Sequence, residues 1–436
     1  MPQFPWTASG PPLSPSDGEQ YAAKPDIKFG SEGRRWEIEM RLMSASPGGR
    51  DLSRRSLIGG GLALTLAGCN SGIEMPGAEV GAPAAPPAAA FGPTVGETLG
   101  SGPVRVGMIL PLSQNGAPSP VGASMRNAAQ MAIEEFAGSS VTLMIQDDRS
   151  SPDGAAQSAQ AELGAGAELL LGPVYAPDVR QAASVAKAAG KPMIAFSTDA
   201  TVAQPGVYLL SFLIQTYVDR IVQFAVSRGK KSFAVMAPQN DYGNVAVAEF
   251  HESAGRLNAP VAVVARYGPG EAQGAAQQVG AVSGQVDALF IPEQADATPS
   301  VAAALASSGI KTQLLGTGVW NDARVLRLPQ LQGAWFSAPD SAGFNAFSQR
   351  YRAKFSSEPA RLATLSYDAV NLAGALARNP DRFSQRALTN VSGFNGVDGV
   401  FRFRADGTNE RGLAVMEIDN NAATVISPAP RSFAAG

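Results

Sequence analysis

The chain has 436 residues, of which 45% are hydrophobic and 16% are charged, with 34 Lys and Arg against 37 Asp and Glu. The formal net charge of −3 disfavours a nucleic-acid role, because neutralising a phosphate backbone requires clustered basic side chains. One Cys and one His exclude an internal disulfide, a multi-histidine metal site and most His-dependent catalytic triads. At about 150 residues per domain, the length suggests two or three structural units.

The front of the chain resembles an extension followed by a secretory leader. Residues 1–42 are polar and Pro-rich, and we predict a mis-called or disordered extension there, with translation starting at Met40 or Met43. Within residues 43–69, basic side chains precede the apolar run Leu57–Gly68. That run is shorter than the roughly 20 residues that a membrane-spanning helix needs. This order of basic, apolar and small residues predicts a signal peptide.

The single cysteine, Cys69, lies where this leader ends. The sequence Leu-Ala-Gly-Cys that ends at Cys69 resembles the bacterial lipobox, in which the thiol receives diacylglycerol and the cysteine becomes the mature N-terminus. A buried structural cysteine is the alternative, but no folded segment is predicted around it. The pair Arg54-Arg55 also resembles a twin-arginine export signal, although adjacent arginines occur in ordinary leaders too. We therefore expect a periplasmic protein that is anchored to a membrane through Cys69.

Residues 70–103 are dominated by Ala, Pro and Gly. Such a segment buries too little apolar area to offset the entropy lost on ordering it, and Pro-rich stretches stay extended. We predict a tether that holds the following domain away from the membrane. A ligand for a Pro-binding module is the alternative interpretation.

From Val104 onward, short apolar runs alternate with helix-like stretches. Strands are predicted at residues 104–110, 141–145, 169–171, 193–196, 233–236, 261–265, 288–291 and 313–316. Helices are predicted at residues 125–136, in the Ala-rich stretch after 153, and at 179–189, 219–227, 245–257, 272–282 and 299–308. This alternation is typical of parallel sheets covered by helices on both faces. With a further strand predicted at residues 400–403, about nine strands exceed one comfortable sheet, so the pattern predicts an α/β protein with two lobes.

Several short segments of this part of the chain carry a family resemblance. They are Val104–Pro111, Asp147-Asp148, Leu171–Pro173, Pro192–Ile194, Asp241–Gly243, Ser366–Val370 and Gly396–Phe401. In order and spacing they resemble the leucine-binding-protein group of type 1 periplasmic binding proteins, from about Val104 to about Val425. The resemblance implies two Rossmann-like lobes with parallel sheets, joined by three crossovers near Thr216, Ala338 and Asn395. Lobe 1 would comprise residues 104–215 and 339–395, and lobe 2 residues 216–338 and 396–436.

Three further segments look closest to one subgroup, the penicillin-binding protein activators. They are Ile194–Asp199, Tyr208–Phe212 and Arg228–Ser232. The activators keep the binding-protein fold and use it to contact a peptidoglycan synthase.

The resemblance also implies a ligand site beyond the carboxyl ends of the strands. In the family, Ser and Thr side chains of lobe 1 bind the ligand carboxylate, aromatic residues of lobe 2 contact the ligand, and an acid of lobe 2 binds the ammonium. The matching positions here carry Ala176, Ser197 and Asp199 in lobe 1, with Thr201 as a shifted alternative, and Tyr242, Gln294 and Gly318 in lobe 2. Asp199 would repel a carboxylate unless it bound the ammonium, and Gly318 lacks the acid. The alternative for Tyr242 is an aromatic that packs beside a turn. Glu293, at a strand end, either replaces the missing acid or is an exposed loop carboxylate.

Two functions therefore stay open. One is a non-catalytic periplasmic lipoprotein that captures an amino-acid-like solute for an ABC permease. The other is a penicillin-binding protein activator that regulates peptidoglycan synthesis through protein–protein contact. Neither Cys69 nor His251 can complete a nucleophile–base set, so we expect no enzymatic activity, no cofactor and no metal.

Overall fold

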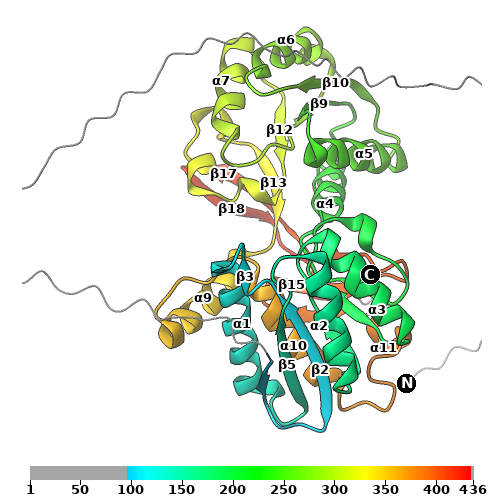
Figure 1. Ribbon diagram of the computed structural model, residues 1–436. Helices are drawn as coiled ribbons and strands as arrows, with labels where there is room; N and C mark the ends of the chain where they lie inside the picture. Colours follow the sequence, from blue (N-terminus) through cyan, green and yellow to red (C-terminus); the bar gives the residue numbers. More distant parts are fainter. Residues whose placement is uncertain (1–95, 434–436) are drawn as a thin grey trace, which may run out of the picture. The chain divides into compact units, whose positions relative to one another are not determined.

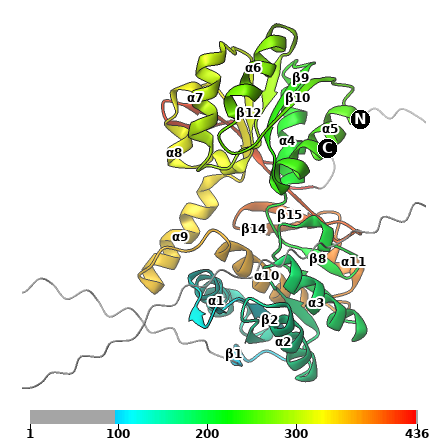
Figure 2. The ribbon, with the colours of Figure 1, turned by 45° about the horizontal axis from the view of Figure 1, so that its top comes forward.

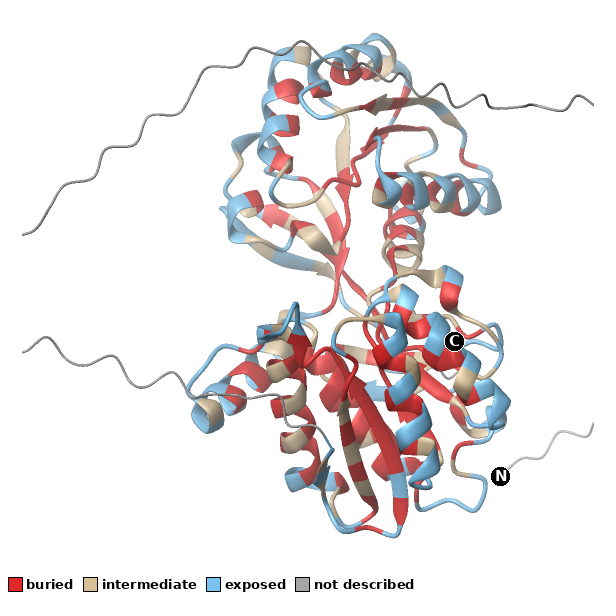
Figure 3. Ribbon diagram, viewed as in Figure 1, coloured by how far each residue is buried: buried red, intermediate tan, exposed pale blue. Residues whose placement is uncertain are grey.

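The structure, a computed structural model, describes residues 96–433. The predictions for the extension, the leader, Cys69 and most of the tether lie outside the described residues. The described part of the chain forms two lobes, each with a central sheet between helices (Figure 1). The strands of both sheets are largely buried (Figure 3). None of the helices in residues 96–433 is long and apolar enough to cross a membrane.

Lobe 1 is built on a six-stranded sheet. In sheet order its strands are β1 (Glu97–Leu99), β5 (Val141–Asp147), β2 (Val104–Leu110), β6 (Leu169–Leu171), β7 (Met193–Ala195) and β8 (Val207–Leu209). All neighbours run parallel except β1, which lies antiparallel at the edge. The inner strand β2 is buried at every position except Arg105. Burial on both faces explains why its sequence is apolar without alternation.

Helices cover both faces of the lobe 1 sheet. One face packs against α1 (Pro120–Ala132) and α10 (Ala363–Leu376), and the other against α2 (Pro152–Gly164) and α3 (Ala176–Ala188). The helix α1 continues into one π-helical turn at Ile133–Ala137, and α9 (Ser341–Phe355) packs beside it. The hydroxyls of Ser119 and Ser151 each accept a backbone N–H three residues on, and a proline follows each serine. These caps start α1 and α2.

Lobe 2 contains a seven-stranded sheet. In sheet order its strands are β10 (Val261–Tyr267), β9 (Phe233–Pro238), β11 (Ala288–Phe290), β12 (Gln313–Gly316), β13 (Trp335–Ala338), β17 (Ala414–Asp419) and β18 (Ala422–Ser427). The first five run parallel, and β17 and β18 are antiparallel. The helices α4 (Ile214–Ser227) and α5 (Asp241–Arg256) cover one face, and α6 (Ala272–Val282), α7 (Thr298–Ser308) and α8 (Ala323–Leu326) cover the other.

The remaining elements are short. They are the hairpin of β3 (Ser113–Gln114) and β4 (Ala117–Pro118), the helix α11 (Gln385–Leu388), and 3-10 turns at Ala200–Val202, Ser283–Gln285, Gly318–Trp320 and Pro329–Leu331. A separate antiparallel sheet consists of β14 (Phe394–Gly396), β15 (Gly399–Phe403) and β16 (Asn409–Arg411).

The chain passes between the lobes at three crossovers. The first lies between β8 and α4, and the second between β13 and α9. The third was expected near Asn395, and the structure corrects this. The sheet β14–β16 packs on lobe 1, where Phe401 and Phe403 join its core and Asn409 Nδ2 donates to Ser211 O at 2.8 Å (Figure 2). The third crossover is therefore at Gly412, and residues 396–411 belong to lobe 1 rather than to lobe 2.

The end of the predicted tether also needs correction. The tether was expected to run to residue 103, but Glu97–Leu99 forms β1 and pairs in register with Leu143–Ile145 of β5. The Glu97 carboxylate forms an ion pair with Arg126 of α1. A three-residue strand between glycines gives too weak a sequence signal to be separated from the Pro- and Gly-rich stretch before it.

Candidate functional site

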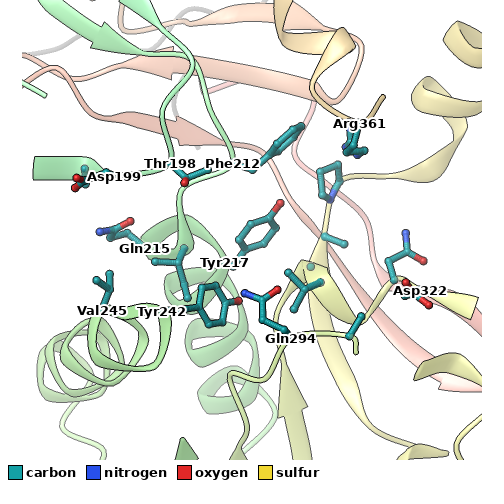
Figure 4. Close-up of a pocket in the computed structure, with 18 of the residues that line it drawn as sticks. Thr198, Asp199, Phe212, Gln215, Tyr217, Tyr242, Val245, Gln294, Asp322 and Arg361 are labelled. Atoms are coloured by element: carbon teal, nitrogen blue, oxygen red, sulfur yellow. The ribbon is translucent and has the colours of Figure 1, made fainter. Parts of the chain in front are cut away.

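A cavity of about 1240 Å³ lies between the two lobes (Figure 4). Its walls come from loops that follow the carboxyl ends of β7, β9, β11, β12 and β13, which is where open α/β sheets bind ligands. The polar side chains that line it are Thr198, Asp199, Thr201, Gln215, Tyr217, Asp241, Tyr242, Asn244, Gln294, Asn321, Asp322, Asp340, Ser341, Asn345 and Arg361. Of the predicted contact residues, the structure brings Asp199, Thr201, Tyr242 and Gln294 to this cavity.

On the lobe 1 wall, the carboxylate of Asp199 is already paired within the protein. Its Oδ1 accepts the Thr201 N–H at 2.9 Å and the Thr201 hydroxyl at 2.6 Å, and its Oδ2 accepts from Arg180 at 3.1 Å. These hydrogen bonds, with that to Thr201 foremost, lower the pKa of Asp199. Asp199 therefore caps a 3-10 turn and pairs with an arginine instead of standing free to meet a ligand.

Ser197 was expected to contact the ligand, and the structure places it elsewhere. Its side chain is only 3% exposed, it accepts the Asp199 N–H at 3.1 Å, and it does not line the cavity. Its neighbour Thr198 lines the wall instead. Alternate residues of an extended chain point to opposite sides, so a register error of one residue exchanges the two. Ala176, the other expected position of this lobe, begins α3 and does not line the cavity.

On the lobe 2 wall, Tyr242 shares a hydrogen bond with the Thr317 hydroxyl at 2.7 Å. Burial raises the pKa of Tyr242 to about 12, so its hydroxyl stays protonated. Glu293 is 3% exposed and accepts from Tyr267 Oη at 2.5 Å, and it does not line the cavity. The interpretation of Glu293 as an exposed loop carboxylate is therefore wrong, and its side chain holds Tyr267 in place.

Gly318 lines the cavity at the position where the resemblance implied an acid. A Cβ atom at residue 318 would lie 2.5 Å from Cε1 of Tyr217. The ring of Tyr217 thus occupies the space that any longer side chain at residue 318 would need. The absence of an acid there follows from the packing of a neighbouring aromatic ring.

A group of charged residues, which we call the hinge charge cluster, contains three buried members and one partly exposed arginine. It consists of Arg361, Asp368, Asp398 and Arg411. The carboxylate of Asp398 is fully buried and accepts from Arg361 Nη1 at 3.0 Å and Nη2 at 2.5 Å, and from Thr364 Oγ1 at 2.7 Å. Asp368 accepts the Val397 N–H at 2.9 Å, and burial raises the pKa of Asp368 to about 7. Arg411 Nε donates to Ser211 O at 2.9 Å, while its Nη1 and Nη2 have no partner among the described residues.

The two arginines of the hinge charge cluster stack on aromatic rings. The guanidinium carbon of Arg361 lies 4.7 Å from the ring centre of Phe344 and 4.3 Å from that of Phe212. The guanidinium carbon of Arg411 lies 4.7 Å from the ring centre of Phe212 and 5.5 Å from that of Phe401. Cation–π contacts of this kind hold a guanidinium in one orientation. The stacking fixes Arg361, which lines the cavity together with Phe212 and Phe344.

The sequence analysis missed Arg361, Tyr217 and Phe212 as cavity residues. Phe212 and Tyr217 lie at the first crossover, whereas Arg361 lies between α9 and α10. The three meet only through the packing of segments that are distant in sequence. Phe212 was noted only as part of a segment that resembles the activators, and no spacing rule connects it to Arg361. Among residues 96–433, no group of three or more His, Cys, Asp or Glu is arranged to hold a metal, and His251 lies exposed on α5.

Comparisons with known proteins agree with this architecture. The family model for periplasmic binding proteins matches residues 103–423. No curated protein sequence matches the chain. Among solved structures, a protein from Rhodospirillum rubrum described as a branched-chain amino acid ABC transporter is 19% identical with a TM-score of 0.67, over 74% of this chain and 99% of its own.

Two further structures carry bound ligands. The branched-chain amino acid transporter substrate-binding protein of Streptococcus pneumoniae, in complex with isoleucine, is 21% identical with a TM-score of 0.51, over 74% of this chain and 99% of its own. A solute-binding protein from R. palustris, in complex with benzoate, is 19% identical with a TM-score of 0.52, over 76% of this chain and 97% of its own. At these identities the structures establish the fold, while the family model covers most of the chain. The chain belongs to the periplasmic binding protein family, and its fold is the type 1, leucine-binding-protein-like fold that its segments resemble.

Proposed function

We propose that the chain is an extracytoplasmic receptor that holds a small polar solute between its lobes and delivers it to an ABC-type permease. The cavity carries this proposal, because both lobes line it and several of its polar groups have no partner. Gln215 Oε1 is buried without a hydrogen bond, and no described residue binds the Tyr217 hydroxyl or the Thr198 side chain. An unpartnered buried polar atom costs about 1–3 kcal/mol, which a ligand that bonds to it would recover.

The contact residues that we propose are Thr198, Thr201, Gln215, Tyr242 and Gln294. They come from both lobes, so a bound solute would link the two halves and favour their closed arrangement. We further propose that the cleft binds its solute without transforming it. A nucleophile needs a base within hydrogen-bond reach, and His251 does not line the cavity.

A thermal-shift screen of the full chain tests the receptor role. The panel should contain amino acids, amides, sugars, polyols, polyamines and organic acids, with each hit measured by calorimetry. We expect at least one hit, with an affinity that Tyr242→Ala lowers by about tenfold or more. Tyr175→Ala is the matched control, because Tyr175 is an exposed tyrosine outside the cavity. If no compound of the panel binds, the receptor role is contradicted. If no compound binds but a purified penicillin-binding protein does, the activator alternative is supported.

The membrane attachment is a separate part of the proposal. We propose that the exported protein begins at a lipidated Cys69 and that residues 70–96 tether it to the membrane. Mass spectrometry of the native protein should find an acylated N-terminal Cys69. Peptides from residues 1–39 in the exported form would contradict this processing.

A further inference from the structure

Arg361 is the one cation among the described residues that line the cavity. Its Nη1 and Nη2 donate to Asp398, and its Nη1 also donates to Thr364 Oγ1 at 3.1 Å. A guanidinium has five N–H donors, and these contacts use three. The Nε proton and the second Nη2 proton make no hydrogen bond to a described residue, and the side chain is 42% exposed. One edge of Arg361 therefore offers two parallel donors, which is the geometry that a carboxylate accepts best.

The Tyr217 hydroxyl is a third donor near this edge. It lines the cavity and makes no hydrogen bond to a described residue. In Figure 4 it points toward the side of the cavity on which Phe212 and Arg361 lie. Burial raises the pKa of Tyr217, so its hydroxyl keeps its proton and can donate it to a ligand oxygen.

The acids of the cavity are poor partners for a ligand cation. Asp199 already accepts a hydrogen bond from Arg180. Asp322 accepts two from Arg324, at 3.0 Å from its Nε and 2.8 Å from its Nη2. The other two lining acids, Asp241 and Asp340, are exposed, and Asp340 also caps α9. An exposed carboxylate contributes little to holding an ammonium group, because water competes for both charges. The pairing and stacking of Arg361, in contrast, fix its orientation before any ligand arrives, which lowers the entropy cost of binding.

The charges behind Arg361 also suit an anion. Asp398 compensates one of the two guanidiniums of the hinge charge cluster, and Arg411 is buried with two unpartnered nitrogen atoms. The second acid, Asp368, is held by burial at a pKa of about 7 and is therefore only partly ionised at neutral pH. Within the hinge charge cluster, the two guanidiniums thus outweigh the ionised carboxylates, and a ligand carboxylate at Arg361 would balance this excess.

We propose that the solute is a carboxylate without an ammonium group, bound through the free edge of Arg361 and the hydroxyl of Tyr217. This inference rests on the proposed receptor function and names the chemical class of its solute. It differs from the expectation of an amino-acid-like solute in requiring that the rest of the ligand be uncharged.

Calorimetry of the full chain at neutral pH with matched ligand sets tests the proposal. Each set contains one amino acid, its α-hydroxy analogue and its deaminated analogue, starting from leucine and from phenylalanine. Within at least one set, we expect the two acids without an ammonium group to bind about tenfold or more tightly than the amino acid. Equal or tighter binding of the amino acids would overturn the inference and leave the receptor function intact.

Variants of Arg361 then test whether this side chain binds the ligand carboxylate. Arg361→Lys keeps a positive charge beside Asp398 but loses the two parallel donors, and we expect the affinity for the preferred acid to fall about tenfold or more. Arg350→Lys is the matched control, because Arg350 also stacks on a tyrosine, Tyr367 at 5.7 Å, and pairs with Glu135 at 3.5 Å, but lies outside the cavity. We expect the control to change the affinity by less than about twofold.

A second variant covers the case in which Arg361→Lys fails to fold. Arg361→Gln combined with Asp398→Asn removes both charges of the pair together, and circular dichroism checks that the chain is folded. The same loss of affinity is expected. An unchanged affinity in either folded variant would overturn the inference. If no member of the matched sets binds, the inference is also overturned, whereas the receptor function fails only if the wider panel is silent too.

Discussion

Two groups of buried carboxylates in lobe 1 differ in their partners. In the hinge charge cluster, Asp398 receives two hydrogen bonds from a guanidinium and one from a hydroxyl. Asp148, which directly follows β5, and Asp178, in the first turn of α3, are buried to a similar extent. The Oδ2 atom of each has no hydrogen-bond partner among the described residues. Burial raises the pKa of Asp148 to about 7 and that of Asp178 to about 6, and Arg149 offsets only the smallest part of the shift at Asp148.

The comparison separates two consequences of burying an acid. A buried carboxylate with a guanidinium partner supports the fold as an ion, so removing either charge leaves the other uncompensated. A buried carboxylate without a cation is favoured in its neutral form, so its ionisation weakens the folded state. The same substitution, Asp to Asn, should therefore have opposite effects at the two places.

The largest effect is expected for Asp398→Asn. The amide cannot balance Arg361 and Arg411, and loss of one partner of a buried pair typically costs 3–5 kcal/mol. Because Arg361 is partly exposed, we expect a loss of about 3 kcal/mol in the free energy of unfolding, near the low end of that range. Urea denaturation followed by circular dichroism measures it, with the exposed Asp381→Asn as control. A loss no larger than that of the control would contradict the role of the pair.

Asp148→Asn should act in the opposite direction. Burial raises the pKa of the native carboxyl from 3.8 to about 7, so the unfolded chain ionises at lower pH than the folded chain does. The free energy of unfolding is therefore highest at acid pH and falls as pH rises from the unfolded pKa to the folded pKa of about 7. The amide keeps an oxygen for the Ser150 N–H, which Asp148 accepts at 2.7 Å, and cannot ionise. We expect the free energy of unfolding of the variant, relative to that of the native chain, to rise by about 2 kcal/mol from pH 5 to pH 8. Denaturation curves at both pH values measure this gain, and equal differences at the two values would contradict it.

A neutral hydrogen-bonded pair should give a smaller effect than either buried charge. Tyr242→Phe removes the hydroxyl that meets Thr317 Oγ1 at 2.7 Å and leaves the buried threonine without this partner. We expect the free energy of unfolding to fall by about 1 kcal/mol. Adding Thr317→Val should recover most of the loss, since the double variant leaves neither group unsatisfied. A double variant that loses the sum of the two single effects would contradict direct coupling.

The comparison also explains which parts of the molecule could be predicted from the sequence. The strands of both lobes are short apolar runs bounded by helices, and their burial on both faces follows from that pattern. The loops after β7, β9 and β11 follow from the strand ends, and the family resemblance then picked out Asp199, Thr201, Tyr242 and Gln294 within them as cavity residues. The strands depend on local sequence alone, whereas the choice of residues within the loops depended on the resemblance.

Features that depend on distant contacts could not be predicted in this way. The assignment of Gly396–Arg411 to lobe 1 rests on the packing of Phe401 and Phe403 into its core. The pairing of Arg361 with Asp398 and its stacking on Phe212 bring together three segments that are distant in sequence, and no spacing along the chain indicates these contacts. The burial of Asp148 was equally hidden, because a carboxyl after a strand is more often exposed than buried.

The smallest effect is expected where a charge pair lies in water. Asp199 and Arg180 meet at 3.1 Å, with their side chains 36% and 52% exposed, so solvent screens the attraction. Asp199→Asn keeps an oxygen for the Thr201 N–H and loses only the charge, and we expect the free energy of unfolding to fall by less than about 1 kcal/mol. The loss should shrink further in 1 M salt, where the screening length is about 3 Å. Urea denaturation at low and high salt measures both quantities. A loss comparable to that of Asp398→Asn, or one that salt leaves unchanged, would mean that hydrogen bonding rather than burial decides how strongly a carboxylate supports this fold.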